Sequence, residues 1–264
     1  MPIDSIAALI EPVKQAGAIA FAEQRRVAIV ERKYKQDGSI LTQVDQKVED
    51  YLVSQLVERY PGANIIGEEA SRSYDPDRHD TFAVDPIDGT DVYSLGMPGW
   101  CVSVGLLDEH LMPVAGILYA PAWNLLLVAD VGQKVRAEGA EIVAPHPVDL
   151  TSAASSLMVS SRIHRWLDLK DYAGKARSVG SAALHLAFQL IYPTVDGAIQ
   201  HPGACLWDLA GSHALLRSCG LTAEYLNGKA VDYAELLDGS SLRDVVLAGT
   251  GETVLGLRGI VIRR

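Results

Sequence analysis

The segment Asp85-Pro86-Ile87-Asp88-Gly89-Thr90 directly follows the short apolar run Phe82-Ala83-Val84. Pro86 stiffens the connection between the two aspartates, so the segment predicts a rigid turn that directs both carboxylates toward one point. Such carboxylates repel each other unless a cation or hydrogen bonds offset the repulsion. Gly89 and Thr90 can then present backbone N–H groups at the start of a short helix. Because carboxylates bind hard cations and helix N-termini bind phosphate, the segment indicates metal-assisted chemistry on a phosphate ester.

Three further acidic segments lie at the ends of expected helices or strands. Asp45 opens an expected helix, Glu68 with Glu69 follows an expected strand, and Asp208 begins another helical run. Taken singly, Asp45 and Asp208 are also good helix N-caps, and a Glu-Glu pair is commonly a solvated surface. Residues at the edge of a regular element are held rigidly and can still face a cavity. The four acidic segments together therefore favour one shared acidic site.

The composition is that of a soluble globular protein. Of 264 residues, 48% are hydrophobic and 21% charged, enough for one large domain or two small ones. The formal net charge of −10 argues against non-specific nucleic-acid binding, and an anionic substrate would need cations at its site. Cys101, Cys205 and Cys219 have no metal-ligand spacing, so we expect reduced core residues in a cytoplasmic protein. We expect neither a secretory leader nor a membrane span.

Apolar periodicity predicts alternating helices and strands in both halves of the chain, which is typical of a layered α/β fold. A turn is expected at Asp37-Gly38, and the polar segment 71–80 is expected to form a mobile loop. Expected helices cover the first 30 or so residues, 45–60, 181–192 and 208–218; expected strands cover 64–67, 82–84, 101–107, 114–120, 125–129, 157–160, 245–248 and 259–262.

Three ordered motifs resemble those of the inositol monophosphatase family, which belongs to the magnesium-dependent, lithium-sensitive phosphomonoesterases. The motifs are Ile65-Ile66-Gly67-Glu68-Glu69, the segment 85–90, and Trp207-Asp208-Leu209-Ala210-Gly211. Leu41-Thr42-Gln43-Val44-Asp45 is similar to the segment before the first motif, and Gly180-Ser181-Ala182-Ala183 to a loop on the substrate side. The resemblance covers nearly the whole chain. It implies an α-β-α-β-α sandwich of the inositol monophosphatase and fructose-1,6-bisphosphatase type, with the site at the strand ends.

The resemblance further implies one domain over 1–264, with a metal-site subdomain at 1–145 and a substrate-pocket subdomain at 146–264, divided near Pro145-His146-Pro147. It implies that Glu68, Asp85 and the Ile87 carbonyl bind a first Mg²⁺. Asp85, Asp88 and Asp208 would bind a second, weaker Mg²⁺, and Glu68 would border a third site. Ligand sets made only of oxygen favour Mg²⁺ or Mn²⁺ over Zn²⁺, and we expect Li⁺ and Ca²⁺ to inhibit.

The resemblance also assigns residues to catalysis and to substrate binding. Thr90 would help activate the attacking water with support from Asp45, and Glu68 would act beside it. The Gly89 and Thr90 amides would hold phosphate oxygens. The implied substrate-binding residues are Asp88, Gly89, Thr90, Gly180, Ser181, Ala182, Gln200, His201 and Asp208.

Departures from the family pattern leave the substrate open. Asp91-Val92-Tyr93 replaces the usual Thr-Asn-Phe, although an acid is favourable in the first turn of a helix. His185 stands where the family often has Asp or Asn. The Glu that reads sugar hydroxyls in inositol-specific members has no counterpart, and an apparent one-residue insertion places either Gln200 or His201 at its position. Either residue could hydrogen-bond a hydroxyl, and a protonated His201 could meet a second phosphate.

The expected function is Mg²⁺-dependent hydrolysis of a small phosphate monoester, inositol monophosphate or a related polyol or sugar phosphate, by a metal-activated water. The alternatives are a 3′(2′),5′-bisphosphate nucleotidase, a fructose-1,6-bisphosphatase, or a non-catalytic binding or regulatory protein. Haloacid dehalogenase-type phosphatases place their two acids two residues apart, whereas Asp85 and Asp88 are three apart. The expected partners are a small phosphorylated substrate and a second copy of the chain, with no nucleic acid and no membrane.

Overall fold

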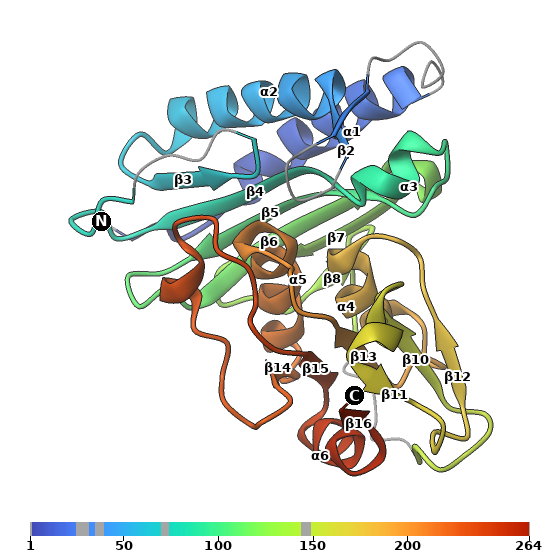
Figure 1. Cartoon of the computed structure of the whole chain (residues 1–264). Helices are drawn as coiled ribbons and strands as arrows, with labels where there is room; N and C mark the ends of the chain where they lie inside the picture. Colours follow the sequence, from blue (N-terminus) through green and yellow to red (C-terminus); the bar gives the residue numbers. More distant parts are fainter. Residues whose placement is uncertain (1, 25–31, 35–39, 70–73, 144–148, 264) are drawn as a thin grey trace.

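Two β-sheets and three layers of helices alternate in the structure, a computed structural model that describes residues 2–24, 32–34, 40–69, 74–143 and 149–263 (Figure 1). Helices α1 (Ile10–Gln24) and α2 (Gln43–Arg59) cover the outer face of a seven-stranded sheet. Helices α4 (Ala182–Ile191) and α5 (Leu206–Ser218) lie between that sheet and a five-stranded sheet. Helix α6 (Gly251–Ile260) packs on the outer face of the smaller sheet. The expected α-β-α-β-α sandwich is therefore confirmed.

The large sheet has the strand order β3-β4-β5-β6-β7-β8-β9. Strands β3 and β4 are parallel, and the remaining neighbours are antiparallel. Its strands are β3 (Asn64–Gly67), β4 (Thr81–Asp88), β5 (Cys101–Leu107), β6 (Pro113–Ala120), β7 (Leu125–Ala129), β8 (Arg136–Ala137) and β9 (Ala140–Glu141). β4 and β5 are buried along their whole length, because helices cover both faces of the sheet.

The small sheet has the strand order β12-β10-β13-β15-β14. β10 (Ser156–Val159) is parallel to both β12 (Lys175–Arg177) and β13 (Gly197–Gln200), whereas β15 (Val246–Gly249) is antiparallel to β13 and to β14 (Thr222–Tyr225). The remaining short elements are β1 (Arg32–Tyr34) with β2 (Ile40–Thr42), β11 (Leu167–Asp168) with β16 (Ile262–Arg263), α3 (Thr90–Ser94), and the 3₁₀ turns η1 (Ala7–Leu9), η2 (Pro121–Trp123), η3 (Ile163–Arg165) and η4 (Tyr233–Leu236).

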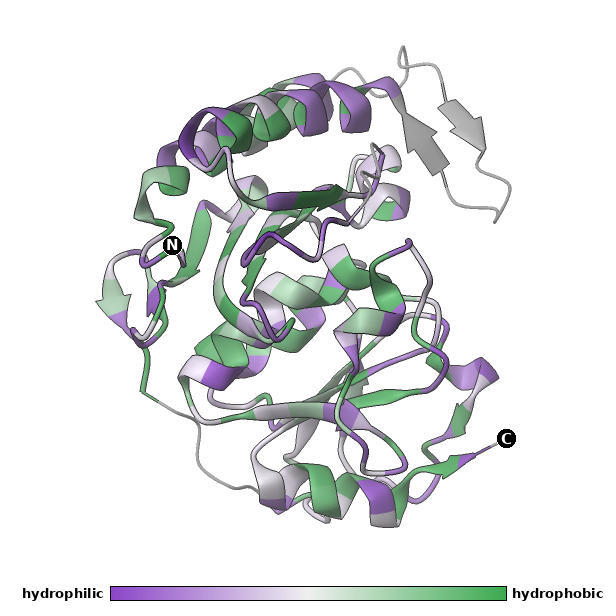
Figure 2. Ribbon diagram, turned by 90° about the vertical axis from the view of Figure 1, so that its left-hand side faces the viewer, coloured by the Kyte–Doolittle hydropathy of each residue, from purple (hydrophilic) through white to green (hydrophobic). Residues whose placement is uncertain are grey.

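The helices follow from their apolar spacing. In α2 the predicted stripe of Val48, Leu52 and Leu56 is almost fully buried against the sheet, as a period of 3.6 residues requires. α4 is buried along nearly its whole length, because it is covered by a sheet on each side. In Figure 2 the strands of the large sheet are mainly hydrophobic, whereas the outer helices carry both hydrophobic and hydrophilic residues.

Helix starts differ from the predictions at the two acids that were also candidate N-caps. α2 begins at Gln43 and α5 at Leu206, so Asp45 and Asp208 are each the third residue of a helix rather than its cap. The strand predicted at 259–262 is wrong. There α6 continues to Ile260, and only Ile262–Arg263 pair with β11. Propensity alone does not separate an apolar helix end from a short strand.

The turn predicted at Asp37-Gly38 and the break predicted near 145–147 lie outside the described residues, as do residues 71–73 of the polar segment. The three cysteines form no disulfide with one another. Cys101 is buried in the core as predicted, whereas Cys205 and Cys219 are only partly buried and pack against its edge. Among the described helices, none is long and apolar enough to cross a membrane.

Buried His213 makes the stability of the fold depend on pH. It lies on α5, its Nδ1 is 2.8 Å from the Tyr233 hydroxyl, and burial lowers its pKa to about 4. Unfolded histidine takes up a proton near pH 6.5, so stability falls as the pH drops from about 6.5 toward 4. We expect His213 to account for a loss of about 2 kcal/mol between pH 7 and pH 5.

Urea unfolding of the wild type and His213→Gln at both pH values, in EDTA, measures this contribution. The variant should lose about 2 kcal/mol less than the wild type on acidification. Equal losses in the two proteins would contradict the assignment, whatever the variant costs at pH 7.

Candidate metal and phosphate site

Parallel pairing brings the first acidic residues together. β3 and β4 run side by side with Gly67 opposite Val84, and the Glu68 N–H donates to the Val84 carbonyl at 3.2 Å. The carboxyl ends of the two strands therefore meet at one edge of the sheet, which places Glu68 beside Asp85. Asp88 follows on the same strand, after an irregularity in the pairing of β4 with β5 between Asp85 and Asp88. That irregularity turns both aspartates toward the same pocket.

Gly89 turns the chain from β4 into α3. Its φ of 101° lies in the left-handed region that favours glycine, and a Cβ there would meet the Gly99 carbonyl oxygen and the Trp100 side chain at 3.2 Å. The turn is stabilised by the Thr90 hydroxyl, which donates to the Ile87 carbonyl at 3.1 Å, and by the Ile87 N–H, which donates to Asp85 Oδ1 at 3.0 Å. The predicted helix start at Gly89 and Thr90 is confirmed, whereas β4 continues to Asp88, with an irregularity in its pairing where a turn was predicted.

Asp88 is held by the start of α4. Its Oδ1 accepts from the Ala182 N–H at 3.0 Å, and its Oδ2 accepts from the Ala183 N–H at 2.7 Å and from the Ser181 hydroxyl. Ser181 also caps α4 by accepting from the Leu184 N–H at 2.9 Å. A carboxylate at a helix N-terminus meets otherwise unpaired amides and the positive end of the helix dipole. These contacts fix Asp88 between the two halves of the fold.

Asp208 reaches the site because α5 packs very closely on the large sheet. A Cβ on Gly116 of β6 would lie 2.3 Å from the Gly211 carbonyl oxygen, and a Cβ on Gly105 of β5 would lie 2.5 Å from the Gly211 nitrogen. Three glycines thus let helix backbone and strand backbone touch. Asp208, one turn earlier on α5, accepts from the Cys205 backbone N–H and faces the β4 carboxylates.

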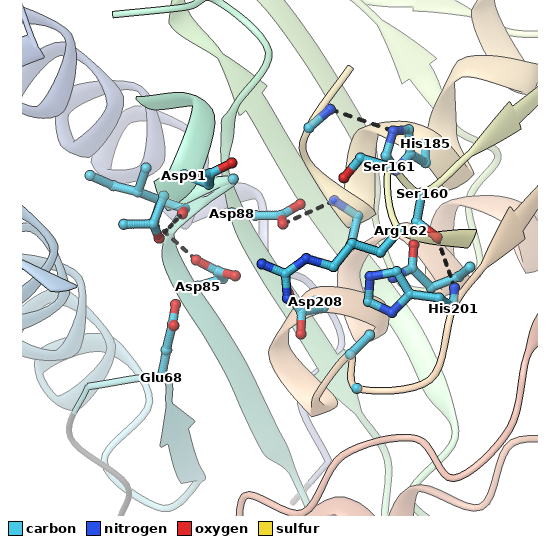
Figure 3. A pocket seen from close by; sticks show the side chains of 18 residues that line it. Glu68, Asp85, Asp88, Asp91, Ser160, Ser161, Arg162, His185, His201 and Asp208 are labelled. Carbon is cyan, nitrogen blue, oxygen red and sulfur yellow. Dashed lines mark hydrogen bonds between the residues drawn. The ribbon is translucent and has the colours of Figure 1, made fainter. Parts of the chain in front are cut away.

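The resulting cluster is strongly acidic. One carboxylate oxygen each from Asp85, Asp88 and Asp208 lies within 4.8 Å of the others, and Glu68 lines the same pocket (Figure 3). Burial raises the pKa of Asp85 well above its usual value, and the charges of Glu68 and Asp88 raise it further. Burial also raises the pKa of Asp88, to about 6, although the bonds from Ser181, Ala183 and Ala182 lower it. A cation would remove the part of these shifts that comes from repulsion between the carboxylates.

The donor set fits a hard divalent cation. The cluster offers carboxylate oxygens only, and Ile87 lines the same pocket. No histidine belongs to the group, and oxygen ligands suit Mg²⁺ or Mn²⁺. Asp85, Asp88 and Asp208 are brought together as the sequence predicts, with Glu68 next to them.

The other sequence-predicted residues line the pocket around this cluster, with two exceptions, Ser181 and Asp45. Gly89, Thr90, Gly180, Ala182, Gln200 and His201 line the pocket, which has a volume of about 220 Å³. Ser181 acts through Asp88 instead of lining the pocket. Asp45 is also absent from the lining; it is fully buried on α2, and its charge contributes to the raised pKa of Asp85.

The wall opposite the carboxylates comes from the small sheet. β10 and β13 are parallel with Val159 opposite Ile199, so Ser160 and the end of β13 meet at the same edge. The Ser160 hydroxyl accepts from the His201 N–H at 2.9 Å. The His201 ring stacks on Trp166, with centroids 5.0 Å apart, and its Nδ1 lies against the Pro202 carbonyl. Burial lowers the pKa of His201, so it is neutral at neutral pH and offers no charge to a second phosphate.

Two buried side chains of the pocket carry a polar atom with no partner among the described residues: Gln200 Oε1 and His185 Nδ1. Gln200 is 3% exposed and His185 1%. His185 Nε2 accepts from the Val179 N–H at 2.9 Å, and burial lowers its pKa to about 3, so the ring is neutral and Nδ1 carries the hydrogen. Both residues line the pocket, although these two atoms are themselves buried, and such atoms are costly unless a ligand or water pairs with them.

Sequence reasoning missed Ser160, Ser161 and Arg162, which line the pocket after β10. Their signal was present: a short polar run with an arginine at the end of a predicted strand, where α/β folds place ligand contacts. The run was not recognised because its strand could be placed beside β13 only in the folded chain.

The five-layer fold and the acidic pocket at its strand ends define a class of layered α/β proteins. The chain belongs to the inositol monophosphatase family, whose model matches residues 4–250. "Inositol monophosphatase 3" of Solanum lycopersicum is 28% identical over 229 residues, covering 80% of this chain and 82% of the relative. "Nus factor SuhB" of Xylella fastidiosa is 27% identical over 220 residues, covering 80% and 78%. The solved structure of extragenic suppressor protein suhB from Bartonella henselae has a TM-score of 0.80, 20% identity and 96% coverage of both chains.

Proposed function

We propose that the protein hydrolyses a small phosphate monoester of a polyol or sugar with the aid of Mg²⁺. The observation that carries the proposal is the convergence of Asp85, Asp88 and Asp208 beside Glu68 at the start of α3. Bound divalent cations would lower the pKa of the attacking water and stabilise the leaving alkoxide. The ligands would be Glu68, Asp85 and the Ile87 carbonyl on one side, and Asp85, Asp88 and Asp208 on the other.

The chain itself would position the phosphate and the water. The backbone N–H groups of Gly89 and Thr90 lie at the mouth of α3 and would hold phosphate oxygens. Thr90 and Glu68 would orient the water. Asp45 would support Thr90 from the buried side of α2. The leaving group would extend toward Gly180, Ala182 and the small-sheet wall, which lie across the pocket.

The unpaired atoms Gln200 Oε1 and His185 Nδ1 favour a substrate that carries hydroxyl groups. Gln200 Oε1 can accept from one substrate hydroxyl and His185 Nδ1–H can donate to another. His201 is turned to its Pro202 carbonyl and to Trp166, so Gln200 takes the hydroxyl-reading position in this proposal. A glutamine is a weaker acceptor than the glutamate of inositol-specific relatives, which supports a small polyol or sugar phosphate without restriction to inositol.

The test is phosphate release from a panel of esters, with and without Mg²⁺. The panel contains inositol 1-phosphate, glycerol 2-phosphate, fructose 1,6-bisphosphate and 3′-phosphoadenosine 5′-phosphate. We expect Mg²⁺-dependent release that EDTA abolishes, strongest for a polyol or sugar phosphate. Faster hydrolysis of 3′-phosphoadenosine 5′-phosphate than of the other esters would mean that the substrate is a nucleotide and not a polyol or sugar phosphate. Silence across the panel, with folded protein, would favour the binding or regulatory alternative, and one relative is named a Nus factor.

The finer parts of the proposal come from the family resemblance. Mn²⁺ would substitute for Mg²⁺, while Li⁺ and Ca²⁺ would inhibit. The protein would act in the cytoplasm as a homodimer, with metal ligands mainly from 1–145 and the substrate wall from 146–264. Inhibition assays and sedimentation of the purified chain test the metal and dimer parts directly.

A further inference from the structure

We propose that Arg162 binds a second anionic group, a phosphate or carboxylate, on the leaving-group side of the substrate. The inference rests on the proposed function, because it names a feature of the substrate that the same site takes. It would make Arg162 a specificity-determining residue, one that separates doubly anionic esters from neutral polyol phosphates.

The first argument is position. Arg162 follows the carboxyl end of β10, lines the pocket, and extends across it from the small-sheet wall toward the carboxylates (Figure 3). The phosphate-holding turn at Gly89 and Thr90 belongs to the opposite side, which the large sheet provides. A substrate phosphate held at that turn would therefore direct its leaving group toward Arg162.

The second argument is the absence of a counterion. The Arg162 guanidinium makes no hydrogen bond or ion pair of 4.0 Å or less with the described part of the chain. The carboxylates opposite it are the ones that cations would neutralise in the loaded site. With those charges balanced, Arg162 is a positive group in the pocket that a substrate anion can pair with.

The third argument is the support of the wall. Ser160 fixes the His201 backbone, and His201 stacks on Trp166, so the wall beside Arg162 is held in place by both parallel strands. Arg162 lies near enough to His201 for its charge, with that of Arg165, to contribute to the lowered pKa of His201, although burial is the larger cause. His201 itself is neutral at neutral pH, so the arginine supplies the charge that a second anion requires.

The test uses pairs of esters that differ only in the second anion. 3-Phosphoglycerate is compared with glycerol 3-phosphate, and fructose 1,6-bisphosphate with fructose 1-phosphate; the two pairs also separate a carboxylate from a phosphate. In the wild type we expect higher kcat/KM for the doubly anionic member of at least one pair. Arg162→Ala should lower that value about tenfold or more and change the other member by less than about threefold. Arg162→Lys should recover part of the loss.

The matched control is Arg165→Ala. It removes the same charge from the same turn, but Arg165 does not line the pocket, so it should alter both members of a pair by less than about threefold. Equal loss on both members in Arg162→Ala would overturn the proposal, because the arginine would then act on the transferred phosphate. No loss on either member would overturn it as well.

Binding separates this inference from the proposed function. Titration calorimetry with 3-phosphoglycerate and fructose 1,6-bisphosphate in Ca²⁺ needs no turnover. If no ester is hydrolysed, the phosphatase proposal fails, yet weakening of this binding by about tenfold in Arg162→Ala would still support the anion site. Unchanged binding in Arg162→Ala, or no binding to the wild type, would overturn it.

Discussion

Asp88→Asn is expected to lower Mg²⁺-dependent phosphate release by about a thousandfold while the protein still folds. Asp88 is 3% exposed and lies beside Asp85 and Asp208 in the acidic cluster. Asparagine keeps the shape but removes the negative charge, and its amide nitrogen would face one of the α4 N–H groups that the carboxylate now accepts. Steady-state kinetics over a range of Mg²⁺ concentrations measures the loss, and circular dichroism verifies the fold.

The matched control is Asp91→Asn, which removes a negative charge from the same pocket. Asp91 is exposed in the first turn of α3, and its carboxylate points away from the cluster (Figure 3). We expect its activity to stay within about threefold of the wild type, because solvent screens exposed charges. Undiminished turnover in Asp88→Asn would contradict the assignment of Asp88 as a metal ligand, and with it the proposed second metal position.

Stability supplies a readout of Asp88→Asn that does not depend on turnover. Burial raises the pKa of Asp88 to about 6, above the value near 4 of an unfolded aspartate. The folded state therefore holds more protons at this carboxyl, and the contribution of Asp88 to metal-free stability falls as the pH rises from about 4 to 6, opposite in sign to that of His213. Asp88→Asn should flatten this fall in EDTA. It should also reduce the rise in Tm that Mg²⁺ gives the wild type, since a ligand stabilises only the state that binds it.

Gly116→Ala is expected to lower the free energy of unfolding by about 3 kcal/mol, which lowers the Tm by roughly 6 to 10 °C. The added Cβ would lie 2.3 Å from the Gly211 carbonyl oxygen, a backbone atom that cannot turn away. α5 would have to move off the sheet. Because α5 carries Asp208, Mg²⁺ should also raise the Tm of this variant less than that of the wild type. Chemical and thermal unfolding measure both effects.

Gly62→Ala is the control for a glycine without a close neighbour. No atom lies within 4 Å of a Cβ at Gly62, and its φ is not in the left-handed region. Its free energy of unfolding should stay within about 0.5 kcal/mol of the wild type. Equal stability of the Gly116→Ala and Gly62→Ala variants would mean that α5 and the sheet do not touch as closely as the structure shows.

The sequence predicted most of the large sheet and most of the acidic cluster, and the reason is local. In β4 the hydrophobic run and the Asp-Pro-x-Asp-Gly turn are adjacent in the chain, so residues 82–90 define a strand, a bend and a helix start by themselves. The stripe on α2 is also a local pattern. Helix starts were predicted less well: Asp45 and Asp208 look like N-caps in the sequence but are each the third residue of the helix, within its first turn.

The wall opposite the carboxylates was decided by tertiary structure. Nothing in the order of residues says that β10 and β13 run parallel and adjacent, yet only that pairing brings Arg162 beside His201 and into the pocket. The same holds for the contact between α5 and the sheet. The sequence around Gly105, Gly116 and Gly211 does not indicate that these glycines are needed for close packing, because they come from three segments that meet only in the folded chain. Local sequence thus determined which carboxylates the protein offers. Long-range packing decided what faces them, because contacts between distant segments depend on pairings that no local pattern encodes.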